Sequence, residues 1–207
     1  MVEYFVDGGA FMWPILILLI FGLMFALERF YSLMMSSINS KKFFAEVKDT
    51  LTSGGVDGAL DLCNKTRGPV AEVFHAGLSR SHRGLDEVEK AIQNAGTVEM
   101  SFLEKNMIWL NLVVTVAPML GFTGTVAGMI TAFDSIEAAN NISPAVVAGG
   151  ISQALLTTAF GLIVAIIIQL LQNFFVSRID RLVLDMEENS MQLVDHLYEM
   201  ESGKKTK

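Results

Sequence analysis

Two stretches of the sequence combine hydroxyl-bearing and very small residues inside long apolar runs. Residues 117–129 are APMLGFTGTVAGM and residues 149–162 are GGISQALLTTAFGL, and neither stretch contains a charged residue. A lipid-facing surface gains nothing from a hydroxyl or a bare backbone. Glycine inside a membrane, in contrast, lets a second helix approach closely, and a hydroxyl offers a polar contact. The two stretches are therefore predicted to be the inward faces of two transmembrane helices around a shared pathway.

Hydroxyls and one amide are the groups that this pathway could present to an ion. We expect pathway roles for Thr125, Thr157, Thr158 and the amide of Gln153, whereas Thr115 and Thr131 are expected to donate back to carbonyls of their own helix. Pro118 removes a backbone hydrogen bond in mid-helix and is expected to kink it. Helix packing and pore shape are assigned to Pro118, Gly121, Gly124, Gly128, Gly150 and Gly161.

The predicted second and third membrane helices contain no ionisable side chain. A proton relay needs a group that takes up and releases a proton, and an ion site needs negative charge or several oxygens. If this chain conducts ions, the required carboxylate must come from another subunit. No bound cofactor is expected, and the transported species would be H⁺ or Na⁺.

Composition and charge-free runs define the fold class. Hydrophobic residues make up 52% of the 207-residue chain, and residues 8–27, 106–133 and 138–177 lack Asp, Glu, Lys and Arg. Each run is long enough for the roughly 20 residues that a helix needs to cross a bilayer. The chain is predicted to be an all-α integral membrane protein with three transmembrane helices and a cytoplasmic helical domain, with helices two and three extended into the cytoplasm.

The basic residues orient these helices. None of the 15 Lys and Arg residues precedes the first helix or lies between the second and third. The positive-inside rule places the N-terminus outside and the C-terminus in the cytoplasm. The predicted segments are an external leader 1–12, membrane helix 13–35, cytoplasmic helical domain 36–106, membrane helix 107–133, external loop 134–144, membrane helix 145–177 and cytoplasmic helical tail 178–207.

Smaller features complete the prediction. Residues 85–105 are amphipathic and are expected to run unbroken into the second membrane helix, while Ser143-Pro144 should cap and start the third, which the tail continues. Glu28-Arg29 is expected to form a pair near the inner boundary of the first helix. Cys63 is interpreted as a small core residue.

Several functions are not expected. His75 and His82 have no partners at a metal-ligand spacing. The net charge of −7 does not indicate a surface that binds nucleic acid. An enzyme is not expected, because the sequence shows no nucleophile–base pair near the predicted membrane face.

The motifs resemble a known family. APMLGxxGTVxGM at 117–129, followed by GISxALxTTAxGL at 150–162, is similar to the ExbB/TolQ/MotA ion-channel family, and GGAFMWP at 8–14 with Glu28-Arg29 resembles its ExbB branch. The resemblance covers nearly the whole chain. ExbB and TolQ also share three membrane helices with the large loop after the first.

The resemblance implies a bacterial inner membrane, with leader 1–12 and loop 134–144 in the periplasm. It also implies a pentamer of this chain in the membrane lipid, around a central pore that holds the single membrane helices of a dimeric ExbD/TolR-like partner. In the family an Asp on the partner helix carries the ion, and Thr125 and Thr158 match positions that face it. Ion entry would turn one subunit set against the other, and in the ExbB branch the work passes to a TonB-like protein and outer-membrane transporters.

Three positions depart from the family pattern. Gln153 stands where several members have Glu, and Ile167 stands where an Ala-Ile-Pro run is usual. The first departure argues against a proton relay through this subunit itself, and the second suggests a straighter third helix. Thr157 beside Thr158 resembles sodium-driven members.

Alternative functions remain open at this point. The same architecture could serve envelope maintenance in the TolQ manner or gliding motility. A different class is a passive scaffold that anchors a secretion complex without conducting ions.

Overall fold

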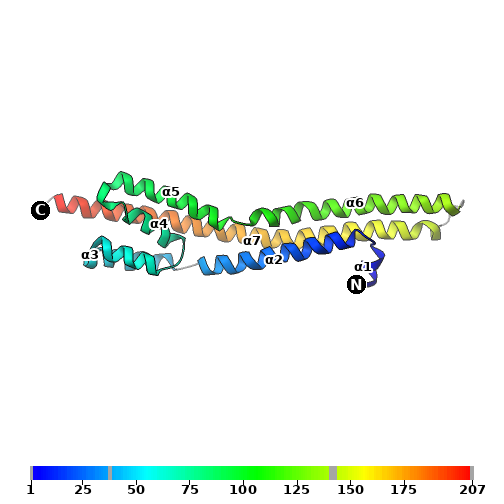
Figure 1. The fold of residues 1–207 in the computed structure, drawn as a ribbon, viewed down its shortest axis with the longest axis horizontal. Helices are drawn as coiled ribbons and strands as arrows, with labels where there is room; N and C mark the ends of the chain where they lie inside the picture. Colours follow the sequence, from blue (N-terminus) through cyan, green and yellow to red (C-terminus); the bar gives the residue numbers. More distant parts are fainter. Residues whose placement is uncertain (1, 37–38, 140–143, 206–207) are drawn as a thin grey trace. The chain divides into compact units, whose positions relative to one another are not determined.

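The computed structural model of the chain describes residues 2–36, 39–139 and 144–205, and every regular element in these ranges is a helix (Figure 1). The elements are α1 (Val2–Asp7), α2 (Met12–Ser36), α3 (Ser40–Lys65), α4 (Pro69–Leu78), the 3₁₀ helix η1 (Ser81–Arg83), α5 (Leu85–Leu103), α6 (Met107–Ala139) and α7 (Pro144–Lys205). Among the described residues, three helices are long and apolar enough to cross a membrane, and they are α2, α6 and α7. The prediction of an all-α protein with three membrane-spanning helices is confirmed.

The chain divides into two compact units, and α2 and α7 contribute residues to both. Unit 1 comprises Met1–Arg29 and Asn106–Phe174, and unit 2 comprises Phe30–Lys105 and Phe175–Lys207. Unit 1 therefore contains most of the apolar helix length, and unit 2 contains α3, α4 and α5 with the second half of α7.

In unit 1, α2, α6 and the first half of α7 lie side by side (Figure 1). Gly22 of α2 lies close to both neighbours, since a Cβ there would lie 2.8 Å from Ile168 of α7 and 3.4 Å from Val113 of α6. Phe21 and Phe25 pack on Trp109 with ring centroids 5.9 Å away. A glycine and three aromatic rings thus tie the first membrane helix to the other two.

The remaining faces of these helices are covered with exposed apolar side chains. Phe122 and Phe133 of α6 and Leu155, Ile166 and Leu170 of α7 each expose more than half of their surface. Large apolar patches on an isolated chain mark contact with lipid or with another subunit. This is the pattern of a membrane helix with one packed stripe and one lipid-facing or subunit-facing side.

The predicted loop 134–144 is shorter than expected. Residues 134–139 continue α6, so Asp134 and Glu137 are helical and that part of the loop prediction was wrong. The alanines and the glutamate in SIEAA favour helix over turn, and neither Gly nor Pro interrupts them. The predicted Ser143 cap lies outside the described residues, and α7 begins at Pro144.

The predicted unbroken run from residue 85 into the second membrane helix was also wrong. α5 ends at Leu103 and α6 begins at Met107, and between them Asn106 adopts a φ of 65°. Asn tolerates this left-handed conformation better than most residues because its short amide can hydrogen-bond locally. The predicted continuation of the third membrane helix through the tail, in contrast, is present, because α7 is one helix of 62 residues.

Unit 2 has its own hydrophobic core. Val47 of α3, Phe74 of α4, Val88 of α5 and Leu193 of α7 are all 0% exposed and belong to one cluster. The rings of Phe43 and Phe74 contact each other within it, with centroids 5.7 Å apart and planes tilted by 32°. The described part of the tail after residue 178 therefore belongs to the helical domain of unit 2 and is not a free extension.

Cys63 lies in this core with 3% of its surface exposed. Burial, together with the negative charge of Glu72, raises the pKa of its thiol to about 11. A thiol of that pKa is a poor nucleophile at neutral pH. The interpretation of Cys63 as a core residue is confirmed.

Candidate functional site

The two motifs form one antiparallel seam between α6 and α7. Along it Gly121 faces Thr157 and Thr158, while Gly161 faces Ala117. At the far end Gly128 faces Gly150, and a Cβ on Gly128 would lie 2.8 Å from the Gly150 carbonyl oxygen. Side chains on these glycines would collide with backbone, so the small residues allow the two helices to touch main chain to main chain.

Thr125 and Thr158 meet in the middle of this seam. Their hydroxyls contact each other, and Thr158 Oγ1 also donates to the Gly121 carbonyl at 3.2 Å. Thr125 Oγ1 lies 3.2 Å from the Ala154 carbonyl and 3.3 Å from that of Gly121. The structure therefore brings these two predicted residues together from opposite helices, and both are half-buried.

Four oxygens converge at this point: two hydroxyls and the carbonyls of Gly121 and Ala154. Each threonine hydroxyl brings one proton and two lone pairs. Such a cluster can donate a hydrogen bond to an adjacent polar group or coordinate a cation through its oxygens. It carries no net charge itself. Chemically it is suited to solvate an ion or a carboxylic acid supplied by another chain.

Thr157 occupies a different position from its neighbour. It is 0% exposed, and its hydroxyl donates to the carbonyls of its own helix, at 3.1 Å to Gln153 and 2.9 Å to Ala154. Its side chain fills the space that a Cβ on Gly124 would need, because Thr157 Cβ would lie 2.7 Å from it. In this chain Thr157 is thus a packing residue of the seam, and its predicted pathway role stays a prediction.

Gln153 lies against the N-terminal segment. Its side chain is the nearest neighbour of Gly9, which has a φ of 71°. A side chain at position 9 would collide with the amide and would also be strained in that backbone conformation. Sequence reasoning missed this contact, although the Gly8-Gly9 pair before the first membrane helix was a visible signal.

The other predicted residues lie where their types suggest. Thr115 donates to the Asn111 carbonyl at 2.9 Å and Thr131 to the Ala127 carbonyl at 3.0 Å, as predicted for hydroxyls bonded to their own helix. Thr123 does the same with Met119 at 2.8 Å. Pro118 is half-buried inside α6, which continues as a helix through it, and the expected kink stays a prediction.

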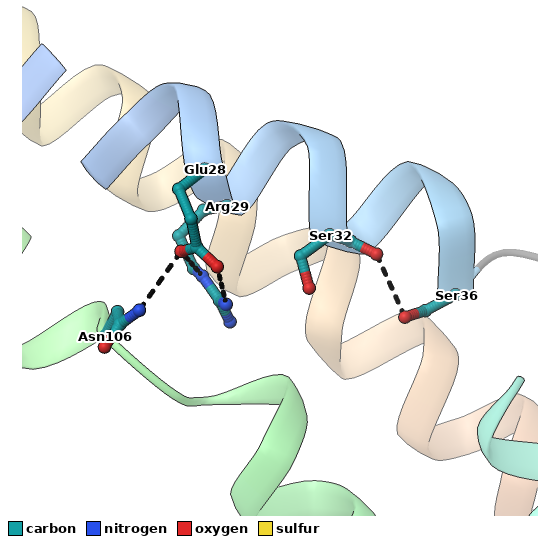
Figure 2. Close-up of polar contacts among 5 residues, drawn as sticks. All are labelled: Glu28, Arg29, Ser32, Ser36 and Asn106. Carbon is teal, nitrogen blue, oxygen red and sulfur yellow. Dashed lines mark hydrogen bonds and ion pairs between the residues drawn. The ribbon is translucent and has the colours of Figure 1, made fainter. Parts of the chain in front are cut away.

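A second polar cluster lies at the end of the unit 1 helices (Figure 2). Arg29 is 2% exposed and donates to both carboxylate oxygens of Glu28, at 2.7 Å from Nε and 2.6 Å from Nη2. Asn106, which directly precedes α6, donates from Nδ2 to Glu28 Oε2 at 3.2 Å. The predicted Glu28–Arg29 pair is confirmed, while the participation of Asn106, 78 residues away, was not foreseen.

Among the described residues no group of three or more His, Cys, Asp or Glu side chains is placed to hold a metal. The polar groups of the α6–α7 seam are hydroxyls and backbone carbonyls, which donate or accept hydrogen bonds and hold no charge.

Comparisons with known proteins agree with this geometry. The model of the MotA/TolQ/ExbB proton channel family matches residues 65–188, which include the seam. A biopolymer transport protein ExbB homolog from Methanothermobacter thermautotrophicus is 34% identical over 179 residues, which are 86% of this chain and 63% of the relative. An ExbB-like biopolymer transport protein from Synechocystis is 26% identical over 90% of both chains.

A Tol-Pal system protein TolQ from Pseudomonas aeruginosa is 31% identical over 125 residues, 55% of this chain and 54% of the relative. The chain thus spans just under two thirds of the length of the archaeal relative and about half of the TolQ protein. The family is one of channels and transport proteins, with ExbB-named and TolQ-named members among the relatives. With its three membrane-spanning helices and its glycine–threonine seam, the chain is a multi-pass membrane protein that belongs to the MotA/TolQ/ExbB proton channel family.

Proposed function

We propose that this chain is the ExbB-like subunit of an ion-driven motor in a bacterial-type inner membrane. Five copies surround the single membrane helices of a dimeric ExbD/TolR-like partner, and a carboxylate on those helices carries the proton. The work passes to a TonB-like protein that energises transport across the outer membrane. The ExbB names of several relatives support this branch of the family.

One observation carries the proposal. The Thr125–Thr158 pair places hydroxyls in a membrane seam whose two helices have no ionisable side chain over residues 107–133 and 145–177. A hydroxyl can solvate a proton or an ion but does not titrate near neutral pH. It must therefore act together with a group that does, because proton transfer needs a site that gains and loses charge. A partner carboxylate in contact with this cluster would supply that charge.

The test is proton flux in liposomes that contain the chain together with a single-span partner bearing a membrane aspartate. We expect flux with both subunits and none with this chain alone. Thr125→Val and Thr158→Val should each lower the rate about tenfold, which corresponds to about 1.4 kcal/mol in the barrier. Thr123→Val is the matched control, because that hydroxyl is exposed and bonds only to its own helix.

Conductance by the chain alone would contradict the proposal, as would unchanged flux in both threonine variants. Repeating the measurement in sodium-free buffer separates a proton-driven from a sodium-driven complex. Flux without any motion of the partner would favour a simple channel over a motor.

A second candidate is envelope maintenance in the TolQ manner, since a TolQ protein is among the relatives. The two functions share the motor and differ in the periplasmic partner. Deletion of the gene distinguishes them: loss of outer-membrane uptake supports the ExbB-like function, and leakage of the outer membrane supports the TolQ-like one.

A further inference from the structure

Unit 2 contains a groove that the proposed motor function does not use. Its volume is about 730 Å³, and it lies between α5 and the second half of α7, which run side by side in opposite directions (Figure 1). Ile92, Gly96 and Met100 line it from α5, and Met186 and Met191 from α7. Met191 is 63% exposed and Met100 39% exposed, so apolar surface in the groove is open to solvent.

The spacing of the lining residues is that of a helix-packing seam. On α5 they recur at intervals of three and four residues from 89 to 100, and on α7 they recur at the same intervals from 183 to 195. Such a pattern presents holes into which the side chains of another helix fit. The wall on α5 is about 17 Å long at 1.5 Å per residue, which matches about three turns of a guest helix.

Gly96 leaves the middle of the groove unfilled. A Cβ at this position would meet only the end of Met186, at 3.9 Å, which is ordinary contact. Position 96 therefore has room for a side chain of the host or of a guest. This differs from the glycines of the α6–α7 seam, where backbone atoms already occupy the space.

A buried hydroxyl in the groove has no partner. Ser190 lines the groove, is 6% exposed, and its Oγ makes no hydrogen bond to any described residue. An unpaired buried hydroxyl is unfavourable by about 1–3 kcal/mol. The accessible surface of this Oγ is below 1 Å², so the hydroxyl lies behind the wall of the groove and offers no contact to a guest.

The charge at the groove selects the kind of guest. Glu89, Glu187 and Asp195 are exposed and line it, and none of the residues that line it is Lys, Arg or His. A guest with basic residues beside its apolar face is attracted, and an acidic guest is repelled. The amphipathic segments of this chain are acidic themselves, since 85–103 contains one Lys against four Asp and Glu, and 178–201 contains two Arg against seven.

We propose that this groove binds a basic amphipathic helix of about three turns from a partner protein. The apolar face of the guest would lie on Met100 and Met191, and its lysines or arginines would face the acidic rim formed by Glu89, Glu187 and Asp195. A second copy of this chain is a poor guest because its corresponding helices carry the same sign of charge as the rim.

The test uses the full chain in nanodiscs of zwitterionic lipid, with empty nanodiscs as the blank because cationic amphipathic helices also bind anionic membranes. The probe is a fluorescent helical peptide of about 14 residues, with leucines at intervals of three and four and lysines beside them. A second peptide has glutamates in place of the lysines. We expect the lysine peptide to bind at least about tenfold more tightly than the glutamate peptide, and to weaken as salt is added.

Two kinds of variant locate the binding. Neutralising the rim with Glu89→Gln, Glu187→Gln and Asp195→Asn should weaken binding of the lysine peptide at least about tenfold. The matched control removes three exposed carboxylates on α3, by Asp49→Asn, Asp57→Asn and Asp61→Asn, and should leave binding within about twofold of the unmodified chain. Gly96→Leu should block the groove, and Met191→Lys provides a second variant if Gly96→Leu does not fold.

Equal binding of the two peptides would overturn the proposal, as would unchanged binding in the rim or Gly96 variants. A change in the number of subunits caused by Gly96→Leu would identify a second copy as the occupant and would also overturn it. None of these outcomes depends on ion flux, so the groove and the proposed motor function are tested separately.

Discussion

Gly128 and Gly150 face each other so closely that a Cβ on either would lie within 3 Å of the carbonyl oxygen of the other. This mutual contact fixes the distance between α6 and α7 at the end of the seam nearest to residues 139 and 144. It makes the seam a contact of two backbones, in which any added carbon must move a helix.

Gly128→Ala should therefore destabilise the folded protein by about 1–3 kcal/mol, the usual effect of overpacking a tight contact. Gly149→Ala is the matched control, since a Cβ at position 149 meets nothing within 4 Å. That control should be neutral or more stable by up to about 1 kcal/mol, because alanine favours helix over glycine. Denaturation in detergent measures both, and equal stability of the two variants would contradict the seam.

The Thr125–Thr158 contact predicts coupling between the two residues. In a double-mutant cycle with Thr125→Val and Thr158→Val, the coupling free energy should be about 0.6 kcal/mol and not above about 1.7, the range for hydrogen bonds between membrane helices. The pair Thr123→Val and Thr158→Val is the control and should be additive. Additivity in the first cycle would mean that the hydroxyls do not interact in the membrane.

Asn106 combines a left-handed backbone with a hydrogen bond to Glu28. Asn106→Gly should lose only the hydrogen bond, whereas Asn106→Ala should lose the bond and add about 1–2 kcal/mol of backbone strain. Thermal unfolding of the two variants measures the difference. If alanine is tolerated as well as glycine, the turn between α5 and α6 does not depend on the positive φ.

Glu99 in unit 2 predicts a pH-dependent stability. Partial burial and the charge of Glu72 raise its pKa above the ordinary value of 4.5, so the folded protein holds this proton more tightly than the unfolded chain does. The carboxylate therefore lowers stability at neutral pH, and this effect disappears as the pH falls below 4.5. Glu99→Gln should raise the melting temperature at pH 7 but not at pH 4.

The exposed Glu188→Gln is the control for the loss of one charge. A Glu99→Gln variant that changes stability equally at both pH values would show that packing, and not titration, is responsible.

The sequence by itself determined the membrane class and the pairing of the two glycine–threonine motifs. Charge-free apolar runs that are long enough to cross a bilayer predict membrane-spanning helices. Glycines and threonines inside such runs predict a closely packed neighbouring helix. The pairing of α6 with α7 and the family therefore followed from composition and motif. The back-bonded hydroxyls of Thr115 and Thr131 were also predictable, because an isolated threonine in an apolar helix has its own carbonyls as the nearest acceptors.

Only the tertiary structure decided which polar groups meet. The periodicity of the sequence identifies the helix face on which a threonine lies, but not the register against the opposite helix. That register brings Thr125 to Thr158 and buries Thr157 against Gly124. The same holds for the break at Asn106 and its contact with Glu28, and for the tail of α7 in the core of unit 2. These features arise from contacts between residues far apart in the chain, whose free energies depend on the packing of whole helices rather than on local preference.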